Sequence, residues 1–398
     1  MAAAGELAPL SPQPMGSYSA LAQDWVFEAL LRLEADGSMK PALASRMERL
    51  DRKSLRAWIR PDARFSDGSP VALNNVVDSL KSAGLTASEQ DGTVLIESAA
   101  AVFPETLLSR ALIYKESGGA TFGTGPFSVI EQDASHLVLR RNQRLPNHID
   151  EVVIRSFATP REAFLRTLAG DADSYPFVDQ KQVEFFENVP RFQVIKGPSV
   201  NAIAVSFGVN RIDRATRVAL LAALSSPELA RLAYPEACSP MRSEPVPFRP
   251  LPPGPRLKIA ALVKVGSTFE RMALAVQRLL GPRAGEIEEI TYADYVRRLE
   301  TGSFDLMIEM PLAWPPSDMA LLWHSRSPFG PRRYSNPKLD AAIDAGDWAR
   351  AMLELAEDPP TAFICLPQRL AIMDARVKNA RIGPYGFLET LPDWEVER

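Results

Sequence analysis

Apolar and polar residues follow strand-like and helix-like periods in turn along this chain. In the stretch RAWIRPDARFSDGSPVALNNV (56–76), alternation over 55–60 predicts a half-buried strand. Pro61 ends that strand because it removes a backbone donor, and the Asp67-Gly68 pair predicts a turn. Apolar residues at helical spacing then predict a helix over about 73–83. The unit therefore reads as strand, turn and helix.

The same periods predict further elements on both sides of this unit. They are helices at 18–33, 160–168 and 213–224, strands at 92–96, 151–157, 192–196 and 202–207, and two strands within 121–142 joined by a polar turn at 132–135.

A proline-dense stretch, CSPMRSEPVPFRPLPPGPR (238–256), reads as an extended connector. Beyond it the pattern restarts as alternating strands and helices. The strands are expected at 256–263, 285–292 and 304–310, and the helices at 268–280 and 293–302. Such alternation predicts an α/β lobe with a largely parallel sheet.

Length and composition narrow the class of protein. A chain of 398 residues predicts two or three lobes. Its hydrophobic fraction of 46% and charged fraction of 24% are those of an ordinary soluble globular protein. The net charge of −4 gives no electrostatic case for nucleic acid. No apolar run approaches the ~20 residues that a membrane-spanning helix needs.

The N-terminus and the cysteines leave the compartment open. The segment MAAAGELAPLSPQPMGSYS lacks the charged start and apolar stretch of a secretory leader, so either the protein is cytosolic or its leader has been removed. Cys238 and Cys365 lie far apart in sequence. One disulfide between them is possible, but two free buried thiols are the expectation.

No motif in the chain points to catalysis or to a metal. The three histidines, His136, His148 and His324, are not spaced as helical ligand pairs, and CxxC and HExxH motifs are absent. The glycine-rich segment GGATFGTGPF (118–127) lacks the Lys-Ser/Thr of a phosphate loop and is interpreted as a tight turn before a strand. No nucleophile signature is present, so we expect neither an enzyme nor a cofactor.

Six segments stand out in order along the chain. They are YSALAQDWVFEALLRLEADGSMKPALA (18–44), IRPDARFSDG (59–68) with VVDSL (76–80), GTGPFSV (123–129) with LVLRRN (137–142), AVSFGVNRIDRATRVALLAAL (204–224), TGSFDLMIEM (301–310) and YSNPKLDAAIDA (334–345). Together they resemble the family 5 extracellular solute-binding proteins, the peptide- and nickel-type receptors of ABC importers.

The resemblance implies an α/β protein with the two-lobed periplasmic-binding-protein fold, type II-like, with an extra small subdomain. Its lobes are discontinuous and joined by hinge strands. Lobe I is expected to comprise 1–38, 120–205 and 369–398, with 39–119 as its small subdomain, and lobe II to comprise 206–368. By the same resemblance, the segment from Arg60 to Leu80 is scaffold and not a reaction centre.

The implied function is that of a periplasmic or cell-surface receptor, whose leader has been removed. It would enclose a small solute between its lobes and deliver it to an inner-membrane permease, with no cofactor, metal or nucleic acid, and as a monomer. An oligopeptide-binding protein is one alternative. A cytosolic ligand-sensing domain of a regulator is another, for which a DNA-binding extension would be expected.

One departure from the family bears on the solute. In peptide receptors an Asp pairs with the amino terminus of the peptide, and in MPLAWPPSDMALLWHS (310–325) its place is taken by Trp314. Trp314 could also simply pack between two prolines. The expected walls of the ligand site are Tyr18, Trp25, Tyr175, Phe177, Met310, Trp314 and Trp323. Such walls favour an uncharged, partly apolar solute, lipid-like or sugar-like, over a free peptide.

Overall fold

The computed structural model divides the chain into two compact units. Unit 1 comprises 1–98, 105–198 and 369–398, and unit 2 comprises 199–368. The residues described are 1–5, 7–12, 19, 22–34, 38–98, 105–176, 178, 180–197, 199, 201–233, 238–240, 250–262, 267–311, 322–326, 334–383 and 387–397. The division comes before strand β16 (Ile203–Phe207), whereas the sequence placed it within that strand, after residue 205.

Unit 1 contains two sheets built from segments that are distant in sequence. One has the order β1-β13-β12-β11 and the other β14-β22-β15. Their strands are β1 (Ala2–Ala4), β11 (Phe127–Gln132), β12 (His136–Arg141), β13 (Glu151–Phe157), β14 (Ser174–Tyr175), β15 (Phe192–Gly197) and β22 (Arg369–Asp374). Helices α3 (Pro160–Leu168) and α4 (Gln180–Glu187) pack against these sheets. The late strand β22 thus sits between two earlier strands.

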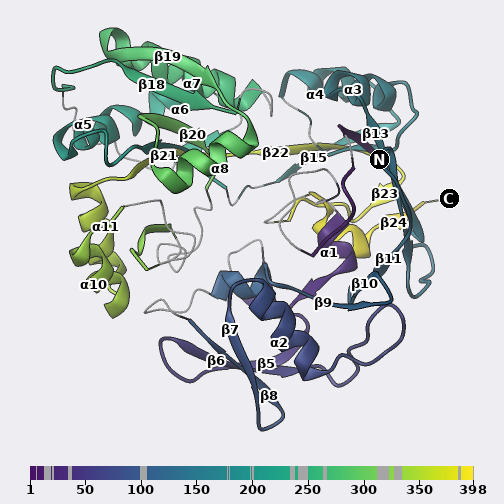
Figure 1. Cartoon of the computed structure of the whole chain (residues 1–398). Helices are drawn as coiled ribbons and strands as arrows, with labels where there is room; N and C mark the ends of the chain where they lie inside the picture. The colour runs from purple at the N-terminus through teal and green to yellow at the C-terminus, as the bar shows by residue number, and fades with distance from the viewer. Residues whose placement is uncertain are drawn as a thin grey trace. The chain divides into compact units, whose positions relative to one another are not determined.

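The rest of unit 1 is antiparallel sheet with one long helix. Its sheets have the orders β5-β6-β8-β7, β10-β9-β2, β3-β4 and β23-β24. The strands are β2 (Glu28–Ala29), β3 (Leu31–Leu33), β4 (Met39–Pro41), β5 (Ala44–Arg49), β6 (Ser54–Ile59), β7 (Thr86–Gln90), β8 (Thr93–Glu97), β9 (Leu112–Ser117), β10 (Ala120–Gly123), β23 (Val377–Lys378) and β24 (Glu395–Val396). Helix α2 (Leu73–Ser82) lies against β7, β8 and β9 (Figure 1). The strand predicted at 55–60 and the helix predicted at 73–83 are confirmed as β6 and α2.

The helix predicted at 18–33 is wrong over most of its described length. Helix α1 spans only Gln23–Val26, and β2 and β3 follow it directly. Apolar residues on nearly every side of this segment are buried, including Trp25, Phe27 and Leu30. Because buried apolar residues follow one another here with few polar breaks, their spacing does not separate helix from strand.

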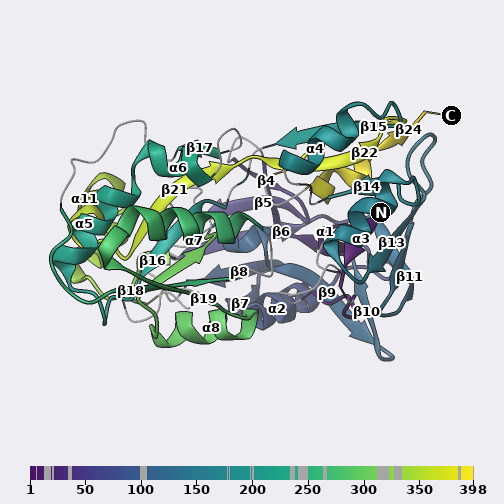
Figure 2. The ribbon, with the colours of Figure 1, turned by 90° about the horizontal axis from the view of Figure 1, so that it is seen from above.

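Unit 2 is built on one six-stranded sheet of order β17-β21-β16-β20-β18-β19. The strands not yet named are β17 (Cys238–Pro240), β18 (Leu257–Ala261), β19 (Ala284–Glu289), β20 (Leu306–Glu309) and β21 (Thr361–Pro367). The helices are α5 (Arg214–Leu224), α6 (Pro227–Ala233), α7 (Ser267–Leu280), α8 (Tyr292–Thr301), α10 (Pro337–Ala345) and α11 (Trp348–Glu357). Helix α7 runs along the sheet and contacts β18, β19 and β20 (Figure 2).

The prediction of a largely parallel sheet is right for only part of unit 2. β18 pairs in parallel with β19 and with β20, as the βαβ pattern predicts. β16 pairs antiparallel with β20 and with β21, and β17 pairs antiparallel with β21. Strands from outside the βαβ segment thus complete the sheet, because burying its apolar faces requires neighbours that local sequence does not name.

The two cysteines form a disulfide, which corrects the expectation of free thiols. Cys238 in β17 and Cys365 in β21 are 127 residues apart in sequence, with Cα atoms 5.6 Å apart. Because β17 and β21 are neighbours in the sheet, the two side chains can meet. The bridge anchors the start of the proline-dense stretch to the core of unit 2, where Cys365 is fully buried.

Within the described residues, no helix combines the length and the apolar composition needed to cross a bilayer.

The hairpin β11–β12 carries a histidine between two carboxylates. The His136 ring contacts Glu131 Oε1 at 3.0 Å and Asp133 Oδ2 at 2.9 Å. The hydrogen bond to Glu131, together with Asp133, raises the pKa of His136 above its ordinary value of 6.5. The protonated ring therefore stabilises the fold below the ordinary pKa, and this contribution is lost as the pH rises through the folded-state pKa.

We therefore expect Glu131→Gln to lower the pKa of His136, measured by NMR titration of the ring protons. Asp133 remains in the variant, so the pKa should fall without losing the whole upward shift. An unchanged His136 pKa would show that Glu131 does not hold the proton there.

Candidate functional site

A cavity of about 380 Å³ lies inside unit 1, between the N-terminal segment and the small antiparallel sheets. Its volume is within the range of ligand pockets, ~300 to 1,000 Å³. The lining is part charged and part apolar: Asp24, Phe27, Glu28, Ala29, Leu31, Arg32, Leu33, Ala42, Arg60, Ser109, Leu112, Thr124, Pro126 and Pro392.

Three charged residues of this lining are placed by short, well-anchored elements. Asp24 lies in the first turn of α1, and Glu28 lies in β2, which pairs with β9. Arg60 follows directly after β6, and its backbone N–H donates to Leu43 O at 3.1 Å. The acids and the arginine therefore come from separate segments, whose backbones are fixed by pairing.

The glycine-rich segment holds α1 in place beside the cavity. Gly125 N–H donates to Val26 O at 2.9 Å, and Ser66 N–H donates to Gly123 O at 2.9 Å. A Cβ atom added to Gly125 would lie 2.3 Å from Trp25 O, so only glycine allows the two backbones to approach this closely. The FSDG and GTGPF motifs are thus in direct contact, and both act as scaffold for α1.

The FSDG turn is itself tied to the neighbouring sheet. Lys115 Nζ on β9 lies 2.6 Å from Asp67 Oδ2, and it sits over the rings of Phe65 and Phe122. The side-chain hydrogen bond from Lys115 is the largest of the causes that lower the pKa of Asp67 to about 2.

Burial dominates the electrostatics of the two acids. Desolvation raises the pKa of Glu28, and the opposite charge of Arg60 partly offsets that rise. Desolvation likewise raises the pKa of Asp24, with Arg110 opposing it. Arg60 Nη2 lies 3.1 Å from Glu28 Oε2, with the two side chains 39% and 23% exposed. The charged groups described in the lining are therefore the Glu28–Arg60 ion pair, the carboxyl of Asp24 and the guanidinium of Arg32, which pairs with Glu34 at 2.9 Å.

The lining combines charged, hydroxyl and apolar side chains. Its described residues include carboxylates, a serine and a threonine, but no histidine, cysteine or lysine. The described part of the chain also contains no group of three or more acidic, histidine or cysteine side chains placed to hold a metal ion. Charged groups beside an apolar wall instead match the recognition of a small polar molecule.

The sequence-predicted ligand walls fall in different places. Trp25 is fully buried beside Phe127, with ring centroids 6.4 Å apart, and Tyr175 is buried in another apolar cluster of unit 1. In unit 2, Met310 is half-buried and Trp323 packs edge-on against Tyr334 and Phe363. Tyr18, Phe177 and Trp314 lie outside the described residues. The role of these side chains as ligand walls stays a prediction.

Sequence reasoning missed Asp24, Glu28 and Arg60. Glu28 interrupts the apolar run from Trp25 to Leu31, and Asp24 directly precedes that run, four residues before Glu28. Charges within a run that must be buried are a signal for a polar site, because an unpaired buried charge is costly. The sequence therefore contained a signal for Asp24 and Glu28. It contained none that Arg60 would line the same cavity.

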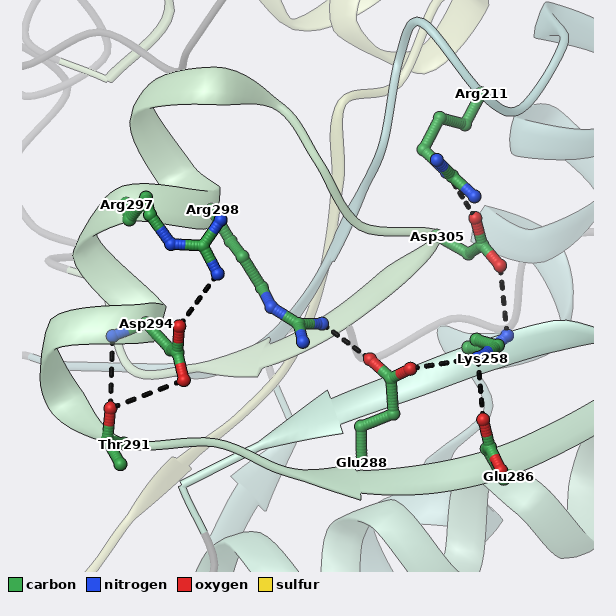
Figure 3. A network of polar contacts seen from close by, with 9 residues as sticks. All are labelled: Arg211, Lys258, Glu286, Glu288, Thr291, Asp294, Arg297, Arg298 and Asp305. Atoms are coloured by element: carbon green, nitrogen blue, oxygen red, sulfur yellow. Dashed lines mark hydrogen bonds and ion pairs between the residues drawn. The ribbon is translucent and has the colours of Figure 1, made fainter.

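In unit 2 the aspartate of the Phe-Asp-Leu motif has a structural role (Figure 3). Arg211 Nε donates to Asp305 Oδ1 at 2.6 Å, and the backbone N–H of Lys258 donates to Asp305 Oδ2 at 3.1 Å. Asp305 thus joins the segment after β16 to the start of β18.

The same network continues through Lys258 into β19 and α8. Lys258 Nζ contacts Glu286 at 2.6 Å and Glu288 at 3.0 Å, and Arg298 Nη1 on α8 donates to Glu288 at 2.5 Å (Figure 3). The hydrogen bond from Arg298 is the first cause that lowers the pKa of Glu288. These pairs hold α8 to the sheet edge and leave no unpaired charge for a ligand among the residues drawn.

Comparison with solved structures finds likeness over the whole chain. The oligopeptide-binding protein AppA of Bacillus subtilis, in complex with a nonapeptide, superposes with a TM-score of 0.77 over 100% of this chain and 98% of its own, at 15% identity. NikA of Staphylococcus aureus, in complex with Ni(L-His)2, gives 0.76 over 100% and 99%, at 14% identity. The chain has the solute-binding-protein fold.

The murein tripeptide binding protein MppA of Escherichia coli shows the same solute-binding fold, with a TM-score of 0.74 over 100% of this chain and 98% of its own, at 17% identity. These neighbours are family 5 solute-binding proteins, and they are substrate-binding proteins, not enzymes. Family models and curated protein sequences give no match to the chain. These structural likenesses confirm the predicted fold class.

Proposed function

We propose that the protein is a solute-binding receptor that captures a small molecule and delivers it to a membrane transporter of ABC type. The observation that carries this proposal is the extent of the likeness: the superposition with AppA covers 100% of this chain and 98% of the other. Both units are thus included. Because a fold by itself does not fix function, the proposal also needs a ligand.

We also propose that the protein works outside the cytoplasm, in the periplasm or at the cell surface. The disulfide between Cys238 and Cys365 supports this location, since such bridges form and persist in oxidising compartments. The alternative is a cytosolic ligand-sensing domain of a regulator. In the reducing cytosol, however, the disulfide would tend to be reduced.

For the delivered solute, we propose an uncharged, partly apolar molecule, lipid-like or sugar-like. The replacement of the peptide receptors' aspartate by Trp314 supports this, because an indole offers a stacking surface and not a partner for an ammonium group. The neighbours themselves bind a nonapeptide, a nickel–histidine complex and a murein tripeptide, so their fold accommodates ligands of several classes. An oligopeptide-binding protein is therefore the alternative within the same class.

We expect Trp314→Ala to weaken binding of the delivered solute by roughly ten- to a hundred-fold, because burying an indole face contributes ~1 to 3 kcal/mol. Ligand released from gently purified protein is identified by mass spectrometry and titrated into wild type and variant by calorimetry. Trp58→Ala is the matched control: it removes a half-buried indole from β6, where Arg46 stacks on the ring.

A library of di- and tripeptides is titrated in parallel. Tight binding of free peptides by the wild type, with Trp314→Ala unaffected, would favour the oligopeptide receptor and place the ligand contact elsewhere.

A further inference from the structure

The cavity of unit 1 contains an acceptor that lacks a donor. Among the described residues, the Asp24 carboxylate has no hydrogen bond or ion pair, and the charge of Arg110 lowers its pKa from nearby. Asp24 also lines the cavity directly. Since a partly buried carboxylate is costly without donors, this group favours an occupant that donates hydrogen bonds, above all a cationic one.

The same cavity contains a donor that lacks an acceptor. Arg60 uses Nη2 to bind Glu28, at 3.1 and 3.4 Å from its two oxygens. Arg60 Nε is buried and has no hydrogen-bond partner within the described part of the chain. A guanidinium that still has a nitrogen without a partner favours a carboxylate as a further acceptor. Of the charged groups described in the lining, Asp24 and Arg60 are thus incompletely satisfied, whereas Arg32 pairs with Glu34 and Glu28 pairs with Arg60.

An apolar wall completes the cavity. Leu31 and Leu33 project to the same side of β3 and are buried, and Leu112 on β9 is 9% exposed. All three line the cavity with Phe27. Its volume of about 380 Å³ lies near the lower end of the range for ligand pockets, so a small metabolite is favoured over a long peptide.

From these features we infer that the cavity binds a small zwitterion the size of one amino acid, with its ammonium group at Asp24, its carboxylate at Arg60 and an aliphatic side chain against Leu31, Leu33 and Leu112. The site lies wholly within unit 1. Its lining does not include Trp314, and the inference does not depend on which solute is delivered.

The test is calorimetric titration of the full chain with leucine and with two analogues that each lack one charge. Isopentylamine lacks the carboxylate, and 4-methylpentanoate lacks the ammonium group. We expect leucine to bind at least ten-fold more tightly than either analogue, because each missing group leaves a charged partner unsatisfied. No measurable binding of leucine, or equal affinity for all three, would overturn the inference.

Two variants assign the contacts. Asp24→Asn keeps the shape of the side chain and should weaken leucine binding roughly ten- to a hundred-fold while leaving 4-methylpentanoate unchanged. Arg60→Gln should weaken leucine and 4-methylpentanoate alike. Arg46→Gln is the control, because it removes an arginine paired with Glu48 on β5, outside the lining. Loss of binding in Arg46→Gln as large as in Arg60→Gln, or Asp24→Asn binding leucine as tightly as wild type, would contradict the assignment.

The leucine titrations can succeed or fail independently of the proposed receptor function. Leucine should still bind when the co-purified solute saturates the protein, and it should bind Trp314→Ala as it binds the wild type. If the protein delivers no solute to a transporter, the leucine titrations still test the zwitterion site of unit 1.

Discussion

Gly125→Ala should destabilise unit 1 by at least about 3 kcal/mol, measured as a lower urea midpoint in equilibrium unfolding. The added Cβ would lie 2.3 Å from Trp25 O and 2.7 Å from the carbonyl carbons of Trp25 and Val26. All three contacts are backbone atoms, which cannot rotate away. Relief would require separating Gly125 from α1, and that would break the 2.9 Å hydrogen bond from Gly125 N–H to Val26 O.

Gly84→Ala is the matched control for this effect. Gly84 has a φ of +82°, and a Cβ there would meet nothing within 4 Å. Its expected cost is therefore only that of a left-handed backbone, roughly 1 to 2 kcal/mol. If the urea midpoint of Gly125→Ala is no lower than that of Gly84→Ala, the close backbone approach of the glycine-rich segment to α1 does not contribute the proposed stability.

Reducing the disulfide should lower the free energy of unfolding by roughly 2 to 5 kcal/mol. The bridge closes a loop of 127 residues, and for a loop of that length the chain-entropy account gives about 5 kcal/mol at room temperature. Urea unfolding of the wild type with and without dithiothreitol measures the difference on one and the same sequence. This matters because Cys365 is fully buried, so a substitution would also remove packing.

The double variant Cys238→Ala with Cys365→Ala separates the bridge from the reductant. It should be no more stable than the reduced wild type, because the substitution also removes packing at Cys365, and its unfolding should not respond to dithiothreitol. A wild-type midpoint that is the same in both conditions would mean that the bridge contributes nothing to stability.

Several helices could be predicted because their signals are local. Pro160 opens α3, and the hydroxyl of Thr159 accepts from Glu162 N–H at its start. Asp213 begins α5 in the same way, accepting from Thr216 N–H at 2.9 Å. Caps of this kind act within a few residues of the chain, so they are visible in the sequence without any knowledge of the fold.

The cavity could be predicted only in part. Asp24 and Glu28 are visible as charges within a run of buried residues. Arg60 and Leu112 reach the same cavity from 32 and 84 positions beyond Glu28. Their placement follows from the pairing of β2 with β9 and from the backbone contact of Arg60 with Leu43. Neither contact has a sequence signature of its own.

The sequence by itself determined where strands and helices alternate, where turns interrupt them, and which motifs resemble a solute-binding receptor. Those features depend on interactions between near neighbours along the chain. The tertiary structure alone decided the pairing of Cys238 with Cys365, the antiparallel half of the unit 2 sheet, and the strands at 28–33 in place of a helix. Each of these is set by residues far apart in sequence, which meet only when burial of apolar surface selects one arrangement of the whole chain.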